Sequence, residues 1–323
     1  MNEQLYNVSA NPHVRDKAST HSIMLDVIIA LLPATLFGFW NFGVKAIINT
    51  VICVAVCVLA EYVWQRCMHQ KVTVKDFSAA LTGLLLALNL PPEVPFWIPV
   101  IGGLFAIIVV KQLFGGLGQN FMNPALGARC FLLISFAGIM TNFSYNGFGG
   151  SFDATTSATP LAALKAGEVV NLKAMFLGNT AGTIGETSAL LLLVGGVYLI
   201  AKKIISWRIP VCYIVTLGLF VLLFGGHGFD MTYLAEQLCG GGLMLGAFFM
   251  ATDYVTSPIT PRGQIIFGIC CGIFTGLFRC FGANAEGVSF AIILSNLLVP
   301  MIEKYTVPNA FGVVKTKPEK EAK

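Results

Sequence analysis

The chain has 323 residues, of which 56% are hydrophobic and only 11% are charged, and its formal net charge is +4. Soluble domains carry about 25% charged residues, so this composition excludes a soluble protein and indicates that lipid surrounds much of the chain. The weak positive charge does not indicate a nucleic-acid partner.

The chain begins with polar residues 1–22, which are expected to form a cytoplasmic N-terminal segment at the membrane surface. Apolar runs follow at 23–42, 45–64, 78–91, 97–115, 122–139, 187–204, 209–226, 235–251, 263–280 and 286–304. A membrane-spanning helix needs about 20 apolar residues, and the third and eighth runs are short. Each of these ends in proline-containing sequence, at Asn89–Pro92 and Thr252–Pro258. Because proline stops a helix, the sequence predicts ten transmembrane helices, with the third and eighth broken.

Two segments of the chain are similar to each other. Leu113–Asn120 recurs as Leu277–Asn284, with the leucine, phenylalanine, glycine and asparagine in register. Each segment joins the fourth and fifth helices of its half, and the two short runs also occupy matching places. Since each half has an odd number of helices, the membrane repeats 23–139 and 187–304 must have opposite orientations. The expected fold class is an all-α polytopic membrane protein built from two inverted five-helix repeats.

Lysines and arginines are distributed unevenly among the predicted loops. If the N-terminus is cytoplasmic, most of them lie on the cytoplasmic side, as the positive-inside rule requires. Both termini, including the tail 305–323, are then cytoplasmic, and the loop 140–186 faces outward.

The loop 140–186 contains the one segment that looks like an attachment point for a cofactor. Residues 153–160 read Asp-Ala-Thr-Thr-Ser-Ala-Thr-Pro and match the pattern in which a threonine hydroxyl is esterified to the phosphate of FMN. The positions of this pattern are Asp153, Thr156, Ser157, Ala158 and the acceptor Thr159. A loop rich in serine, threonine and glycine gives a transferring enzyme access to the hydroxyl. The alternative is that so short a pattern arises by chance in a Ser/Thr-rich loop.

Three segments together resemble the NqrB/RnfD family of membrane subunits: Asp153–Pro160, Asn120–Arg129 and Met250–Pro258. The similarity covers nearly the whole chain, and the length is closest to the RnfD-type members of Rnf complexes, which some bacteria call RsxD. The resemblance implies an electron-transfer subunit of the bacterial cytoplasmic (inner) membrane. Its complex would couple ferredoxin:NAD oxidoreduction to Na⁺ or H⁺ translocation. Ser157 stands where the family more usually has glycine, and because both are small the loop is still expected to fit the transferase.

The resemblance also implies cofactors and partners. FMN is expected on Thr159 through a phosphoester, and a second, non-covalent flavin (riboflavin) becomes plausible in the membrane core. The implied partners are a flavin-bearing G subunit, the iron–sulfur B and C subunits, and the membrane A and E subunits. The chain has no Rossmann signature and no cluster motif. NAD and ferredoxin are therefore expected to bind those partners, and the chain alone is expected to be inactive, with no catalytic residue or metal ligand of its own.

Polar residues near the predicted helix ends are candidates for a site within the membrane. Asn120 and Asn123 lie three apart, where their amides could bond the pyrimidine edge of a flavin or simply cap the fifth helix. Arg129 is interpreted as the one cation well inside a span, with a flavin phosphate, a carboxylate or a carbonyl cluster as partner. Asp253 is a candidate for an ion path or for a helix cap. Glu61, near a helix end, is expected to extend to the membrane surface.

A second class of function fits the same helices. Two inverted five-helix halves with broken third and eighth helices also describe the urea-channel architecture, so the alternative is a solute channel or secondary transporter without redox activity. The two hypotheses differ at the loop, because a channel has no use for an acceptor at Thr159.

Overall fold

The computed structural model of the chain describes residues 18–143, 159–186, 188–226, 228–282 and 286–308. Within these ranges all regular structure is helical and no strand is present. The first half contains α1 (Thr20–Phe42), α2 (Val44–Cys67), η1 (Val74–Asp76), α3 (Ser78–Leu88), α4 (Trp97–Leu104), the π-helix η2 (Phe105–Gln112), α5 (Pro124–Ser135) and α6 (Ala137–Met140). Farther along the chain come α7 (Pro160–Lys165), α8 (Leu172–Leu177), α9 (Ala189–Ala201), α10 (Arg208–Phe224), α11 (Met231–Cys239), α12 (Leu243–Leu245), the π-helix η3 (Gly246–Met250), α13 (Pro261–Phe281) and α14 (Val288–Thr306).

Helices occur within the predicted apolar runs, and the all-α class is confirmed for the described residues, whereas α7 and α8 lie in the loop 140–186, where no helix was predicted. α1, α2, α13 and α14 are long and apolar enough to cross a membrane, whereas α3, α4–η2, α5, α9 and α10 are apolar but shorter. The run 235–251 differs from the prediction, because α11 and α12 are separate helices on either side of Gly240–Gly242. Gly241 has φ +65°, a conformation that glycine adopts without steric cost, so the chain can turn between the two helices.

Local sequence explains where two of these helices begin. α5 begins at Pro124, which lacks an N–H group that the first turn would leave unbonded anyway. The Asn123 side chain accepts hydrogen bonds from the N–H groups of Ala125 and Leu126. α13 repeats this arrangement, with Thr260 as the cap and proline in the first turn.

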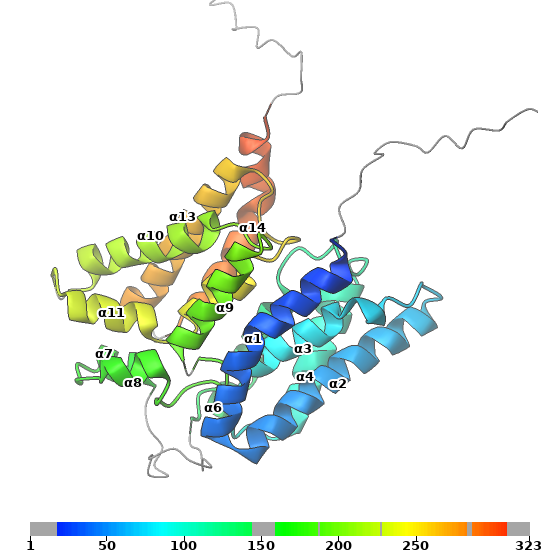
Figure 1. Cartoon of the computed structure of the whole chain (residues 1–323), viewed down its shortest axis with the longest axis horizontal. Coiled ribbons are helices and arrows are strands. Elements are labelled where there is room, and N and C mark those ends of the chain that lie inside the picture. The colour runs from blue at the N-terminus through cyan, green and yellow to red at the C-terminus, as the bar shows by residue number, and fades with distance from the viewer. Residues whose placement is uncertain (1–17, 144–158, 187, 227, 283–285, 309–323) are drawn as a thin grey trace, which may run out of the picture.

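The two halves of the chain lie side by side (Figure 1), the first coloured blue to cyan and the second green to red. The start of α1 and the end of α14 lie toward the upper end of this view, and α6, α7 and α8 toward the lower end. The halves meet where α1 packs on α9 and where α5 packs on α14. α1 and α9 approach closely, since a methyl group added at Gly195 would clash with the carbonyl oxygen of Ala30. The main hydrophobic core contains residues of both halves.

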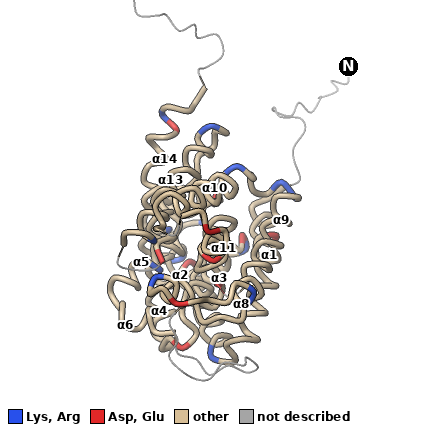
Figure 2. Tube along the Cα trace, turned by 90° about the vertical axis from the view of Figure 1, so that its left-hand side faces the viewer, with Lys and Arg blue, Asp and Glu red and all other residues tan. Residues whose placement is uncertain are grey.

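Charged residues lie within the helical bundle as well as at its ends (Figure 2). Arg129 is not the only buried cation of the described residues, because Lys111 is only 2% exposed and Arg279 only 5%, although both of these lie near the ends of their helices. The expectation that Glu61 reaches the surface is wrong, since this residue is fully buried beside Lys111. Removing such charges from water is costly unless they are paired or hydrogen-bonded. Arg279 accordingly donates to the backbone carbonyl oxygens of Gln237 and Gly240.

Candidate functional site

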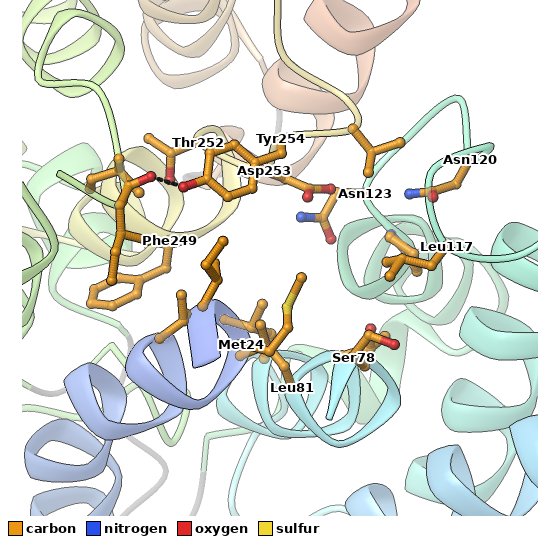
Figure 3. A pocket seen from close by; sticks show the side chains of 18 of the residues that line it. Met24, Ser78, Leu81, Leu117, Asn120, Asn123, Phe249, Thr252, Asp253 and Tyr254 are labelled. Carbon is orange, nitrogen blue, oxygen red and sulfur yellow. Dashed lines mark hydrogen bonds between the residues drawn. The ribbon is translucent and has the colours of Figure 1, made fainter. Parts of the chain in front are cut away.

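A cavity of about 80 Å³ lies where the two halves meet (Figure 3). Its walls come from α1, α3, η2, the segment before α5, α9, η3 and the segment after η3. The polar lining residues are Ser78, Thr82, Lys111, Asn120, Asn123, Thr252, Asp253 and Tyr254. Apolar side chains such as Met24, Leu81 and Phe249 complete the lining. Three of the residues singled out in the sequence, Asn120, Asn123 and Asp253, are therefore brought together from segments far apart in the chain.

Asn123 is occupied by structural hydrogen bonds. Its Oδ1 accepts from the backbone N–H of Ala125 at 3.0 Å, and its Nδ2 donates to the carbonyl oxygen of Met250 at 3.3 Å. Of the two interpretations of this residue, the helix cap is the one that the structure supports. The bond to Met250 also ties the start of α5 to the end of η3 across the two halves.

Asn120 differs from Asn123 in having an unused acceptor. Its Nδ2 donates to the carbonyl oxygen of Met122 at 3.3 Å, but its Oδ1 is buried without a hydrogen-bond partner among the described residues. In Figure 3 the Asn120 amide points toward Asn123 and Asp253. Buried polar atoms are almost always satisfied, so an N–H donor of a bound molecule would fit here. The imide N–H of a flavin ring is such a donor.

Asp253 lies on the opposite side of the cavity from α3 (Figure 3). The carboxylate is half-buried and accepts a hydrogen bond from Thr256 Oγ1 at 3.2 Å. No lysine or arginine of the described part of the chain lies within ion-pairing distance of it. The cavity therefore contains a carboxylate whose charge is not neutralised by a direct ion pair.

Lys111 and Glu61 form a buried ion pair that the sequence patterns did not predict. The Lys111 Nζ atom lies 3.0 Å from Glu61 Oε1 and donates to Ser78 Oγ at 2.8 Å. Glu61 Oε1 also accepts from Gln112 Nε2 at 2.9 Å and from Gln65 Nε2 at 3.2 Å. The sequence nevertheless contained a signal for this pair. Glu61 and Lys111 are opposite charges within predicted apolar runs, and a charge at membrane depth needs a partner.

A second charged cluster surrounds Arg129. Its guanidinium donates to Asn89 Oδ1 at 2.6 Å, to Glu186 Oε1 at 3.2 Å and to Glu286 Oε2 at 2.5 Å. Glu286 Oε1 in turn accepts from the backbone N–H of Gly242 at 2.6 Å. Of the three partners considered for Arg129, a carboxylate is therefore present. The cluster joins the end of α3, α5 and the segments before α9, α12 and α14, so it links both halves.

The ends of the two short helices meet beside this cluster. Asn89, the first residue after α3, has its amide 3.7 Å from the sulfur of Met250, the last residue of η3. The helix ends that precede the two proline-containing segments therefore lie together in the structure.

Thr159 is the one residue of the flavin-acceptor pattern that the structure describes. Asp153, Thr156, Ser157 and Ala158 lie outside the described residues. Thr159 is half-buried and caps α7, with its Oγ1 accepting from the Ala162 N–H at a long 3.4 Å. The hydroxyl borders a small cavity of about 20 Å³ that Glu186 and Glu286 also line. The Thr159 hydroxyl is therefore weakly bonded and lies at the edge of a cavity.

Full-length relatives of the chain are found in several bacteria. The D subunit of the Na⁺-translocating ferredoxin:NAD⁺ oxidoreductase complex of Acetobacterium woodii is 49% identical over 327 residues, covering 100% of both chains. The D subunit of the proton-translocating ferredoxin:NAD⁺ oxidoreductase complex of Clostridium ljungdahlii is 43% identical, covering 96% of this chain and 97% of that one. The D subunit of the ion-translocating oxidoreductase complex of Salmonella paratyphi A is 37% identical, covering 95% and 99%. The shared pattern described as the NQR2, RnfD, RnfE family matches residues 7–312. Because this pattern covers nearly the whole chain and the relatives match it over almost their full length, the chain belongs to the NQR2, RnfD, RnfE family.

Proposed function

We propose that this chain is a membrane electron-transfer subunit of an ion-translocating ferredoxin:NAD oxidoreductase complex, with FMN esterified to Thr159. The observation that carries the assignment to such a complex is the full-length identity of 49% to a relative with that name. The acceptor pattern at 153–160 and the weakly bonded Thr159 hydroxyl support the covalent flavin. FMN would supply one- and two-electron transfer, and Thr159 would hold it at the end of the bundle where α7 and α8 lie.

The alternative function is a solute channel without redox activity. Both functions fit a helical membrane fold. Only the hypothesis of a covalent flavin predicts that the polypeptide itself is fluorescent. We expect the denatured, membrane-extracted chain to fluoresce as a flavin on a gel. A non-fluorescent chain, isolated from cells that make the flavin transferase, would favour the channel.

We further propose ten membrane spans arranged as an inverted repeat, in the bacterial inner membrane. The contacts of α1 with α9 and of α5 with α14 support this, because they pair the first helices of the two halves with each other and likewise the last. The last helices of the two halves also begin in register with the repeated segments. Pro124, where α5 begins, and Val288, where α14 begins, are as far apart in the sequence as Leu113 and Leu277. Both termini would be cytoplasmic. A C-terminal reporter that is active only outside the cytoplasm should stay silent, and activity of that reporter would contradict the topology.

The partners we propose are the G, B, C, A and E subunits of the complex. The chain has no motif of its own for NAD or ferredoxin, so these partners would bind the soluble carriers.

Asn120 and its unused Oδ1 make the cavity between the halves the proposed place of a second, non-covalent flavin. Asn123 would shape this cavity as the cap of α5, and Arg129 would hold its neighbouring helix ends together.

Asp253 is the proposed ligand of a cation path through the cavity. Its charge is not neutralised by a direct ion pair, and a carboxylate in a low dielectric attracts a cation strongly. We expect Asp253→Asn, tested in the assembled complex, to reduce ion transport per electron at least several-fold. Asp230→Asn is the matched control, because Asp230 is an exposed carboxylate that caps α11. If electron transfer and ion transport both survive in Asp253→Asn, this residue is structural only.

A further inference from the structure

Lys111 occupies an unusual position, since it is a buried lysine in the wall of the cavity. It is the only lysine or arginine among the described lining residues. The π-helix η2 carries it, and π-helical turns occur frequently at functional sites. The unused acceptor of Asn120 lies in the wall of the same cavity. A ligand that binds to Asn120 would therefore lie in the cavity that Lys111 also lines.

The partner of Lys111 is held in a fixed position. Glu61 accepts from both Gln65 and Gln112 as well as from Lys111. Gln65 is itself anchored, because its Nε2 donates to Thr73 Oγ1 at 2.7 Å and its Oε1 accepts from the Thr73 N–H at 2.9 Å. These bonds hold the Glu61 carboxylate beside Lys111, and Glu61 itself is not among the residues that line the cavity.

Stability alone does not account for this ion pair. Replacing a buried ion pair by apolar residues of similar volume is often neutral or stabilising. A role that does require a positive charge is the stabilisation of negative charge on a ligand in the cavity. Reduction of a flavin increases its negative charge, and a nearby ammonium group would favour the reduced form.

We propose that Lys111 is a positioning residue that raises the reduction potential of the ligand in this cavity, and that Glu61 limits this effect. The inference rests on the second, non-covalent flavin of the proposed function. It assigns opposite electrostatic effects to the two members of one ion pair. Lys111 favours the added electrons, whereas the Glu61 carboxylate disfavours them.

The test is a spectroelectrochemical titration of the non-covalent flavin in the assembled complex. We expect Lys111→Met to lower its midpoint potential by about 30 mV or more, the equivalent of a tenfold change in the equilibrium constant of a two-electron couple. We expect Glu61→Gln to raise the potential. The double variant Lys111→Met/Glu61→Gln removes both charges, so it should return close to the wild-type value and it leaves no unpaired buried charge that could unfold the chain.

Lys45→Met is the matched control, because it removes a lysine of a partly exposed ion pair with Glu93. It should leave the potential unchanged, and the covalent FMN serves as an internal reference. If the two single variants shift the potential in the same direction, or if the double variant departs as far as Lys111→Met, the pair is structural and the inference is wrong. Acid precipitation of the wild-type complex, which releases non-covalent flavin, distinguishes failure of the proposed second flavin from failure of this inference. No released riboflavin would overturn the second flavin together with this inference, whereas released riboflavin with unchanged potentials in the variants would overturn the inference alone.

Discussion

Replacing Thr159 by alanine is expected to remove all covalently bound flavin from the chain. A phosphoester needs the hydroxyl oxygen, and alanine offers no alternative nucleophile at this position. Thr159→Ser keeps a hydroxyl and should retain part of the flavin. Gel fluorescence of the denatured chain, together with the mass of the peptide that contains residue 159, measures both outcomes.

The structural effect of this substitution is expected to be small. Thr159 caps α7, which has six residues, with one long hydrogen bond, and loss of such a cap costs about 1 kcal/mol. Thr180→Ala is the matched control, since Thr180 lines the same small cavity and lies outside the acceptor pattern. Ser157→Gly should also keep the flavin, because it restores the residue that the family more usually has. A flavin adduct that persists in Thr159→Ala would show that another residue is the acceptor.

Replacing Arg129 by methionine is expected to destabilise the chain severely. The substitution leaves Glu186 and Glu286 facing each other without the guanidinium that both now contact. Removing one partner of a buried ion pair typically costs about 3–5 kcal/mol, because the remaining charge stays uncompensated. Thermal unfolding of the purified chain in detergent should show a midpoint well below that of the wild type.

The cause of this loss can be tested by removing the remaining charges. In the triple variant Arg129→Met/Glu186→Gln/Glu286→Gln no uncompensated carboxylate is left, so we expect recovery of much of the lost stability. Arg66→Met is the control for loss of an arginine as such, because Arg66 is exposed. A surface substitution of this kind should change stability by less than about 0.5 kcal/mol. Equal destabilisation in the single and the triple variant would mean that the guanidinium acts by packing rather than by charge.

The sequence predicted the positions of the helices far better than it predicted their partners. Apolar runs locate helices because burial in lipid depends on local composition. Two runs were wrongly predicted to be single helices: 235–251, with its central glycines, and 122–139, which is divided into α5 and α6 at Phe136. The ion pairs depend on contacts between distant residues. Arg129 lies 57 positions from Glu186 and 157 positions from Glu286, and no local pattern connects them. Asn123 could be recognised as a cap, because the proline that follows it is a local signal.

The two π-helices make the geometry of the cavity depend on the number of residues as well as on their identity. A π-helical turn closes its hydrogen bonds over five residues instead of four, so it contains an inserted residue compared with an α-helix. In an α-helix each residue advances the side-chain direction by about 100° around the axis. Deleting a residue of η2 that precedes Lys111 would therefore change the direction in which Lys111 points relative to Glu61, even though both side chains of the pair remained. Insertions and deletions in η2 and η3 should consequently be tolerated less well than conservative replacements. The number of residues in these two turns determines where the side chains of the cavity lie.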